Sequence, residues 1–247
     1  NLTDSEVLTL QAAGCSAESW QSIYVAENFD IGNIARCHFE GRVEIEEGVT
    51  LRGSTISNYH ICQGAKVIDT LHLQTRHSST FGNGVKVAAV NENGGRSVAI
   101  YNNLTAQVAY IVAMYRHRKG VVEAILRQID DFAEAERSDM GCVGRNSTIL
   151  GARFIREVNI GQGVTLEGAS LLENGTLLDG AYVGVDVKAK DFIAVENSKI
   201  DLGATLERVF IGENVVVSNG FTAVDSLLFA SSHLENGEAC SIFAGPY

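Results

Sequence analysis

The sequence predicts a mainly β protein built as a parallel β-helix, with a helical cap at its N-terminus and a pair of helices inserted between two blocks of coils. Three observations lead to this fold class: an apolar residue recurs every five or six positions, 25 residues are glycine, and proline occurs once. Globular chains use proline at about 5% of positions, mostly in loops. Many glycines with almost no proline therefore indicate short, regular turns that belong to a repeat.

The repeat is clearest in the main block, predicted over residues 140–247. A period near six matches neither the 3.6-residue period of a helix nor the alternation of a long strand, but it fits very short strands joined by tight turns. The alternative is a β-sandwich, in which apolar and polar residues would alternate with period two along each strand and a turn would follow about every 8–12 residues. All but one of the recurring residues are Val, Ile or Leu: Val143, Ile149, Ile155, Ile160, Leu166, Leu172, Leu178, Val183, Ala189, Val195, Ile200, Leu206, Ile211 and Val217.

Glycine directly follows the aliphatic residue at four places, where we expect a left-handed backbone conformation: Gly144, Gly161, Gly184 and Gly212. Three of these hexads, Ile-Gly-Gln-Gly-Val-Thr from 160, Val-Gly-Val-Asp-Val-Lys from 183 and Ile-Gly-Glu-Asn-Val-Val from 211, resemble the hexapeptide repeat of left-handed β-helix transferases. The resemblance implies a left-handed parallel β-helix, or hexapeptide solenoid. Three hexads would then make a coil of about 18 residues.

A weaker block is predicted over residues 31–101, where the pattern fades beyond the last of Ile45, Leu51, Ile56, Ile61, Val67 and Leu73. Residues 1–30 are predicted as a helical cap over the open end of the coils. Thr3 and Glu6 have the spacing of a capping box, and Gly14 stands where a helix C-terminus needs a left-handed residue.

A helical hairpin is predicted over residues 102–139. Gly120 separates two runs whose apolar residues each share one helix face: Leu104, Val108, Ile111, Val112 and Tyr115 in the first, and Val122, Ile125, Leu126, Ile129 and Phe132 in the second. The basic residues 116–119 would close the first helix, where cations suit the helix dipole. Binding a phosphate is the alternative for these cations.

Charge and cysteine content narrow the classes of function. A net charge of -11 argues against a nucleic-acid partner, and no segment has the roughly 20 consecutive apolar residues of a membrane-spanning helix. The five cysteines are scattered and form no Cys-x-x-Cys pair. This spacing argues against a disulfide framework and against a zinc or other metal site, and it fits the cytoplasm.

Of the six histidines (His38, His60, His72, His77, His117 and His233), His233 is the predicted catalytic base. It opens a segment that leaves the hexad pattern after Val217, and irregular segments of a regular scaffold often carry function. Glu238 or Glu235 would hold the imidazole in one tautomer. Asn236 in the same segment is predicted to bind substrate.

A second irregular segment contains Asn83, Asn91, Glu92 and Arg96 together with several glycines. Closely approaching backbone N–H groups and the guanidinium of Arg96 would bind a sugar or an anion there. An ordinary turn that leads into the helical hairpin is the alternative.

The hexapeptide resemblance implies an acyltransferase of the acetyl-CoA type that acts on a sugar or nucleotide sugar, with acyl-CoA as co-substrate. The alternative is a regulatory or scaffolding module without chemistry, like the β-helical domains of sugar nucleotidyltransferases. By the same resemblance we expect a homo-oligomer, with the trimer as the common form. The chain also looks like one uncharacterised bacterial hexapeptide-repeat family, and by that likeness it would be an N-terminal fragment of a longer protein.

Overall fold

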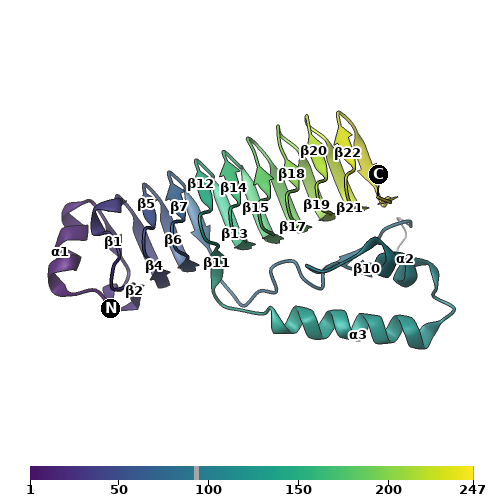
Figure 1. Cartoon of the computed structure of the whole chain (residues 1–247), viewed down its shortest axis with the longest axis horizontal. Coiled ribbons are helices and arrows are strands. Elements are labelled where there is room, and N and C mark those ends of the chain that lie inside the picture. Colours follow the sequence, from purple (N-terminus) through teal and green to yellow (C-terminus); the bar gives the residue numbers. More distant parts are fainter. Residues whose placement is uncertain (92–94, 247) are drawn as a thin grey trace.

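Most of the chain forms a stack of parallel coils. The computed structural model describes residues 1–91 and 95–246, and within them a long sheet of 13 strands and a short sheet of nine run along the whole stack (Figure 1). Neighbouring strands in each sheet are parallel and lie one coil apart. The protein is thus mainly β with long parallel sheets, an arrangement compatible with a parallel β-helix.

The strands are short, as tight coiling requires. The long sheet contains β1 (Ser16–Ala17), β2 (Ile23–Val25), β4 (His38–Ile45), β6 (Thr55–Ile61), β8 (His72–Gln74), β11 (Gly141–Val143), β13 (Phe154–Ile160), β15 (Leu171–Leu177), β17 (Lys188–Ala194), β19 (Thr205–Ile211), β21 (Thr222–Leu228), β23 (Glu238–Cys240) and β24 (Phe243–Ala244). The short sheet contains β3 (Ile34–Ala35), β5 (Thr50–Arg52), β7 (Lys66–Ile68), β12 (Thr148–Leu150), β14 (Thr165–Glu167), β16 (Tyr182–Val183), β18 (Lys199–Ile200), β20 (Val216–Ser218) and β22 (His233–Glu235).

The strand register fixes the length of the main coils at 17 residues, not 18. Ile155, Leu172, Ala189 and Leu206 stack in one inward row, and each of them is buried. A second inward row contains Ile160, Leu177, Ala194 and Ile211. The predicted positions Leu178 and Val195 were each one residue late, because a free choice of five- or six-residue steps does not fix the register.

Each seven-residue strand of the long sheet bends at its middle residue. These residues have positive φ angles between 48° and 55°, and in the main block the hydrogen-bonded pairing between neighbouring strands skips them. We call them the corner row: Asn58, Glu157, Asn174, Asp191, Arg208 and Asp225. Asn and Asp tolerate this left-handed conformation better than most other residues. Because of this bend, each coil contributes two strand segments to the long sheet, one on each side of the corner residue, and one strand to the short sheet.

The four glycines after the aliphatic residues have a different role from the predicted one. Gly144, Gly161, Gly184 and Gly212 do not have positive φ. A Cβ atom at Gly144 would collide with the backbone of Gly161 in the next coil, so close packing of coils requires glycine there. The left-handed residues lie two places later, for example at Asn146 and Gly163.

Glycines also make room for aromatic rings inside the stack. Gly175 pairs with Phe192 in the next coil, and a Cβ atom at Gly175 would overlap the fully buried Phe192 ring. Gly141 and Tyr59 form a similar pair, and the Tyr59 hydroxyl donates to the carbonyl of Val158 at 2.7 Å. Large and small residues thus alternate along the axis of the core.

We expect Gly175→Ala to lower the free energy of unfolding by about 1–3 kcal/mol, because the added methyl group overpacks the core. Phe192→Ala alone should cost about 3–5 kcal/mol, and the double variant should cost less than the sum of the two. Urea unfolding of the four proteins measures this coupling. Gly120→Ala, at a glycine with no atom near its would-be Cβ, is the control and should be neutral or slightly stabilising. Additive costs would contradict the packing described here.

Helix α1 (Asp4–Ala12) covers the N-terminal end of the stack (Figure 1). The Thr3–Glu6 capping box is present, and Gly14 follows the helix with φ of 80°. Leu10 is the residue of α1 that is buried in the main core. Two 3-10 turns, η1 (Trp20–Ser22) and η2 (Ile31–Asn33), complete the cap.

The insertion between the two blocks starts earlier than predicted, since the coils stop at Gln74 and resume at Gly141. It contains the antiparallel pair β9 (Lys86–Val87) and β10 (Val98–Ala99), then α2 (Ala106–Met114) and α3 (Lys119–Ala135). Residues 75–91 and 95–101, assigned to the first block from the sequence, therefore lie outside the coils. Gly120 is in the first turn of α3, and residues 116–118 form the link, so these cations do not close α2.

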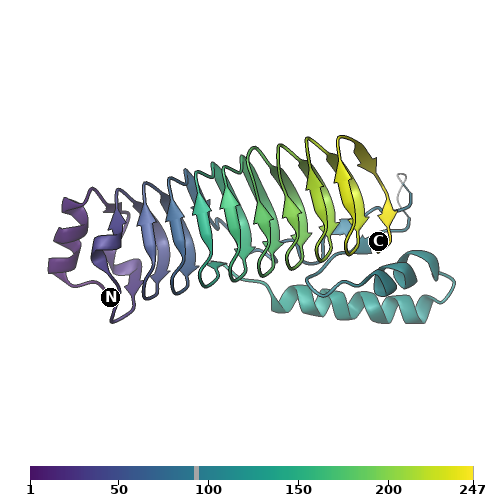
Figure 2. The same ribbon diagram turned by 45° about the horizontal axis from the view of Figure 1, so that its top comes forward.

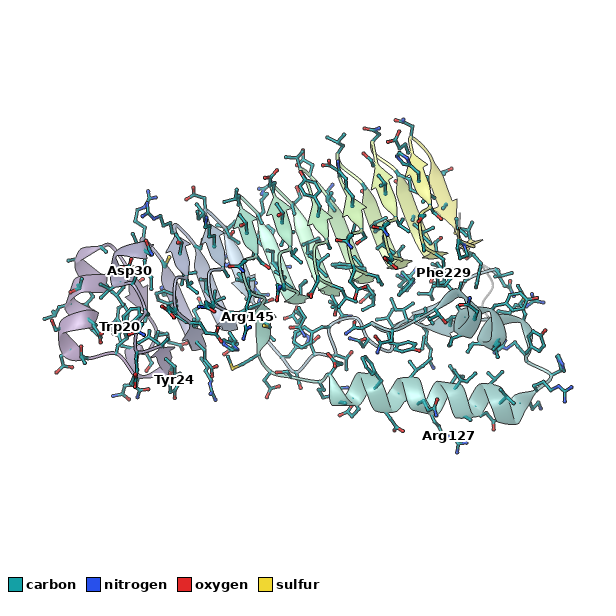
Figure 3. All side chains as sticks on the ribbon, viewed as in Figure 1. Trp20, Tyr24, Asp30, Arg127, Arg145 and Phe229 are labelled. Carbon is teal, nitrogen blue, oxygen red and sulfur yellow. The ribbon has the colours of Figure 1, made fainter. Side chains whose placement is uncertain are left out.

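The insertion lies alongside the C-terminal half of the stack (Figures 1 and 2). A second hydrophobic core forms between them, from Val87, Val98 and Ile100 of the insertion and the outward-facing Ile193, Phe210 and Leu227 of the coils. Phe229, labelled in Figure 3, joins this core and contacts the ring of Phe210.

Polar contacts to the corner row fix the path of the insertion. The backbone N–H groups of Arg76, Gly82 and Ala88 donate to the side chains of Glu157, Asn174 and Asp225, respectively, at 3.0 to 3.1 Å. Later segments of the insertion thus meet later coils, the last contact lying three coils beyond the second. Side chains that project from the bends therefore guide the insertion.

The stability of this contact between the insertion and the coils depends on pH through Asp225. Arg208 donates two hydrogen bonds to its carboxylate, at 2.8 and 2.7 Å, and these bonds lower the pKa of Asp225, with a smaller contribution from the Ala88 N–H. A lowered pKa in the folded state means that the stabilisation is present above the ordinary Asp pKa of about 4 and is lost as the pH falls through the lowered value.

We expect Asp225→Asn to cost about 2 kcal/mol at pH 7. The difference in Tm between wild type and Asp225→Asn should shrink as the pH falls from 7 to below the ordinary Asp pKa of about 4 and the wild-type carboxylate becomes protonated. Thermal unfolding across this range measures it, with the exposed Glu213→Gln as control. A difference that is the same at both ends of the range would contradict a role for the Asp225 charge.

The C-terminal segment continues the coils and is not irregular. β22 pairs with β20, and β23 and β24 pair with β21. On the long sheet, however, the paired residues are one position closer in the sequence than in the earlier coils.

The helices of residues 1–91 and 95–246 are all too short or too polar to cross a membrane.

Candidate functional site

The insertion leaves the coils at a bend of the long sheet. β8 and β11 occupy the two halves of what is a single bent strand in the later coils, and residues 75–140 emerge between them. The Asn58 side chain donates to the carbonyl of Thr75 at 2.8 Å, and Glu157 of the next coil accepts from the N–H of Arg76. We call this place the exit corner.

A histidine and a buried carboxylate face each other at the exit corner. His77 Nδ1 lies 3.7 Å from Glu157 Oε1, and the exposed fractions of the two side chains are 75% and 6%. This distance is within ion-pair range but longer than a hydrogen bond. Hydrogen bonds of catalytic groups are often long in the absence of substrate and shorten when it binds. The pair has the parts of a general base and the group that orients it.

A polar cavity of about 450 Å³ adjoins this pair. Three arginines, Arg76, Arg137 and Arg156, line it together with Glu173 and Asp191. Arg156 forms an ion pair with Glu173 at 3.6 Å, while its Nε is buried and has no hydrogen-bond partner among the described residues. Guanidinium groups of this kind can bind a phosphate or carboxylate through paired N–H groups.

A larger hollow of about 730 Å³ lies between the helices of the insertion and the last coil. Its walls are mainly apolar and include Tyr110, Ile111, Val121 and Phe243, with Arg118 at one side. Among the described residues that line it, none has a side chain that could act as a base near neutral pH. The exit corner is the better candidate for chemistry.

Comparison with known proteins identifies the family. Residues 1–54 and 46–247 match the family model described as Domain of unknown function (DUF4954). The chain belongs to the DUF4954 family. It is also similar to an uncharacterized protein of Treponema pallidum (strain Nichols), with 23% identity over 217 residues. That match covers 71% of the DUF4954 chain and 30% of the relative, so the chain spans less than a third of the relative's length.

In this DUF4954 chain the predicted base, His233, lies on the short sheet. Its side chain is 63% exposed, and its Nε2 is 2.8 Å from Glu235 Oε1 on the same strand. Glu238 is exposed on β23 of the long sheet, and Asn236 is a turn residue with φ of 50° between them. His233 pairs with Glu235, and Glu238 belongs to the other sheet.

The residues of the second predicted segment lie in different environments. Asn83 is buried, and its side chain donates to the carbonyl of Thr80 and accepts from the N–H of Asn102, so it holds the insertion together. Arg96 is exposed and its Nη1 is 3.8 Å from Met114 Sδ of α2. Next to Asn91, the Val90 N–H donates to the carbonyl of Ser241, which brings this segment to the last coil. Glu92 lies outside the described residues.

Nothing in the sequence indicates directly that His77 and Glu157 meet. His77 lies near the start of the insertion and Glu157 lies after its end, and neither belongs to a short motif. The one available signal was the end of the repeat after Leu73, followed by the polar run 74–80, which marks where the chain leaves the coils.

Proposed function

We propose that this DUF4954 chain is the β-helical part of an acyltransferase that moves an acyl group from acyl-CoA to a hydroxyl or amine of a sugar or nucleotide sugar. The observation that carries the proposal is the His77–Glu157 pair beside the polar cavity of the exit corner. The hexads beginning at Ile160, Val183 and Ile211 support it through their resemblance to hexapeptide-repeat transferases.

In this reaction, the ring nitrogen of His77 that faces away from Glu157 accepts the proton of the acceptor group. The acceptor oxygen or nitrogen attacks the thioester carbonyl, a C–O or C–N bond forms, and the C–S bond breaks. The departing thiolate of CoA takes the proton back from the imidazolium, so the base is regenerated. Glu157 favours this proton transfer because a buried carboxylate holds the ring in one orientation and stabilises its charged form.

The arginines of the cavity favour an anionic acceptor. Arg76 follows directly on the coil, Arg156 is on β13, and Arg137 follows α3, so the site draws cations from both the coils and the insertion. These guanidinium groups, two of which also pair with Glu134 and Glu173, can bind the phosphates of a nucleotide sugar or the carboxylate of an acidic sugar through paired N–H groups.

Left-handed coiling, assembly into a homo-oligomer such as a trimer and a place in the cytoplasm are parts of the same proposal. The hexad resemblance supports the first two. All five cysteines are free, which suits a reducing compartment. His233 with Glu235 is the alternative base, and a scaffolding module without chemistry is the alternative function.

The test is an assay of the purified protein with acetyl-CoA and a panel of nucleotide sugars and sugar phosphates. Free CoA and the acylated product are measured by mass spectrometry, because the five free cysteines would react with thiol reagents. We expect one acceptor class to release CoA in a protein-dependent manner and to raise the Tm. Absence of both effects across the panel, with longer acyl-CoA donors also inactive, would favour the scaffolding module.

A further inference from the structure

Three potential metal ligands meet on the outside of the stack, near the place where the insertion rejoins the coils. His60 and Cys62 are two residues apart at the end of β6, so their side chains point to the same side. Cys142 lies opposite His60 in the register between β11 and β6. Between His60 and Cys62, Ile61 points into the core and is fully buried. The fold itself therefore brings one imidazole and two thiols together.

We propose that His60, Cys62 and Cys142 bind a zinc ion. The imidazole nitrogen and the two sulfurs all lie within 4.8 Å of one another, and Cys62 Sγ is 3.7 Å from Cys142 Sγ. Two thiolates bound to one tetrahedral zinc at about 2.3 Å each are separated by about 3.8 Å. The two sulfurs thus already have the separation that zinc requires. Imidazole with two thiolates is also a donor set that selects zinc over magnesium or calcium.

Two glutamates complete the surroundings of these ligands. Glu46 Oε1 is 2.9 Å from His60 Nε2, and Glu44 Oε2 is 4.0 Å from His60 Nδ1. Whichever ring nitrogen binds the metal, the other faces a carboxylate, as is usual for histidine ligands of zinc. Glu46 is itself held by the N–H of Gln63 at 2.8 Å, and its carboxylate is a further oxygen donor beside the cluster.

The charged groups around the cluster favour a cation. The carboxylates of Glu44 and Glu46 lie beside the His60 ring, at 4.0 Å and 2.9 Å from its nitrogens. A divalent ion attracts these carboxylates as well as the two thiolates that it binds.

The position of the cluster suggests what the ion does. His60 and Cys62 belong to the coil before the insertion, and Cys142 is in the first strand after it. Zinc bound to all three would fasten β11 to β6 and so fix the return of the chain to the coils. The interval of eighty residues between the two cysteines hides this site from any search for short zinc motifs.

The experiment uses zinc alone as the probe. Reduced protein is stripped of metal with a chelator, incubated with zinc, desalted, and analysed for bound metal and for Tm. We expect one zinc per chain and a higher Tm. Cobalt in place of zinc should give the thiolate-to-metal absorption in the near ultraviolet and intense visible bands of a tetrahedral site.

Cys142→Ser, Cys62→Ser and His60→Gln should each lose the retained zinc and the cobalt–thiolate absorption, whereas Cys240→Ser, at an exposed cysteine outside the cluster, should keep both. Circular dichroism of the metal-free variants separates loss of the site from loss of the fold. The proposal is overturned if reduced wild type retains no zinc, if folded Cys142→Ser retains as much as wild type, or if Cys62 and Cys142 form a disulfide that reductant does not open.

Discussion

Leu172→Asp is expected to prevent the chain from folding. Leu172 is fully buried, and it stacks in register between Ile155 of the coil before and Ala189 of the coil after. An aspartate there would place a charge in the core without a partner, at a cost above about 4 kcal/mol. Because the whole stability of a domain is typically about 5–15 kcal/mol, one such change is enough to lose the folded state.

Leu171→Asp is the matched control, with the same substitution one residue earlier on the same strand. Leu171 faces outward and is only half-buried, in a row where its neighbour in the next coil is Lys188. We expect this variant to fold with a Tm close to that of wild type. Soluble expression, circular dichroism and thermal unfolding distinguish the two variants. If Leu172→Asp melted like wild type, the register of the coils would be wrong.

The sequence was sufficient to predict the coils and their cap because both depend on local patterns. The inward residues recur at nearly fixed intervals, and Thr3, Glu6 and Gly14 are enough to define the helix that covers the end. The exact coil length needed the structure, because hydrogen bonds between coils, and not residue type, decide that Leu177 and not Leu178 is inward.

The insertion was harder to delimit because its core is formed with another part of the chain. Val87, Val98 and Ile100 are buried against the outside of the coils, so buried apolar residues continue beyond the point where the coils stop. Similarly, the C-terminal segment appeared irregular because its long-sheet strands are shifted by one residue, although β22 remains in register with β20.

Neither the exit corner nor the cluster of His60, Cys62 and Cys142 could be predicted from residue spacing. Each combines residues that are distant in the sequence: His77 at the start of the insertion with Glu157 after it, and His60 and Cys62 before the insertion with Cys142 after it. Both sites form where the insertion interrupts one bent strand. The chain leaves the coils after the first half of this strand, β8, and returns at its second half, β11. Only the register of the coils reveals which distant side chains become neighbours.

His77→Gln is expected to reduce kcat for acyl transfer by a factor of about 10² to 10⁴, the usual effect of removing a general base. Glutamine keeps a polar side chain of similar length, so cavity shape and stability should change little at this exposed position. Glu157→Gln should cause a smaller loss, since Glu157 positions the base and does not touch the acceptor. Arg156→Ala should mainly raise KM for the acceptor.

The most direct test of the proposed site is kcat/KM for CoA release by His77→Gln beside His233→Ala, each measured with the acceptor found in the panel. The structure places the two histidines in different surroundings, His77 next to buried Glu157 and His233 on the open face of the short sheet. We expect a loss of about 10²-fold or more for His77→Gln and wild-type activity for His233→Ala. Wild-type activity of His77→Gln, or a comparable loss in His233→Ala, would contradict it.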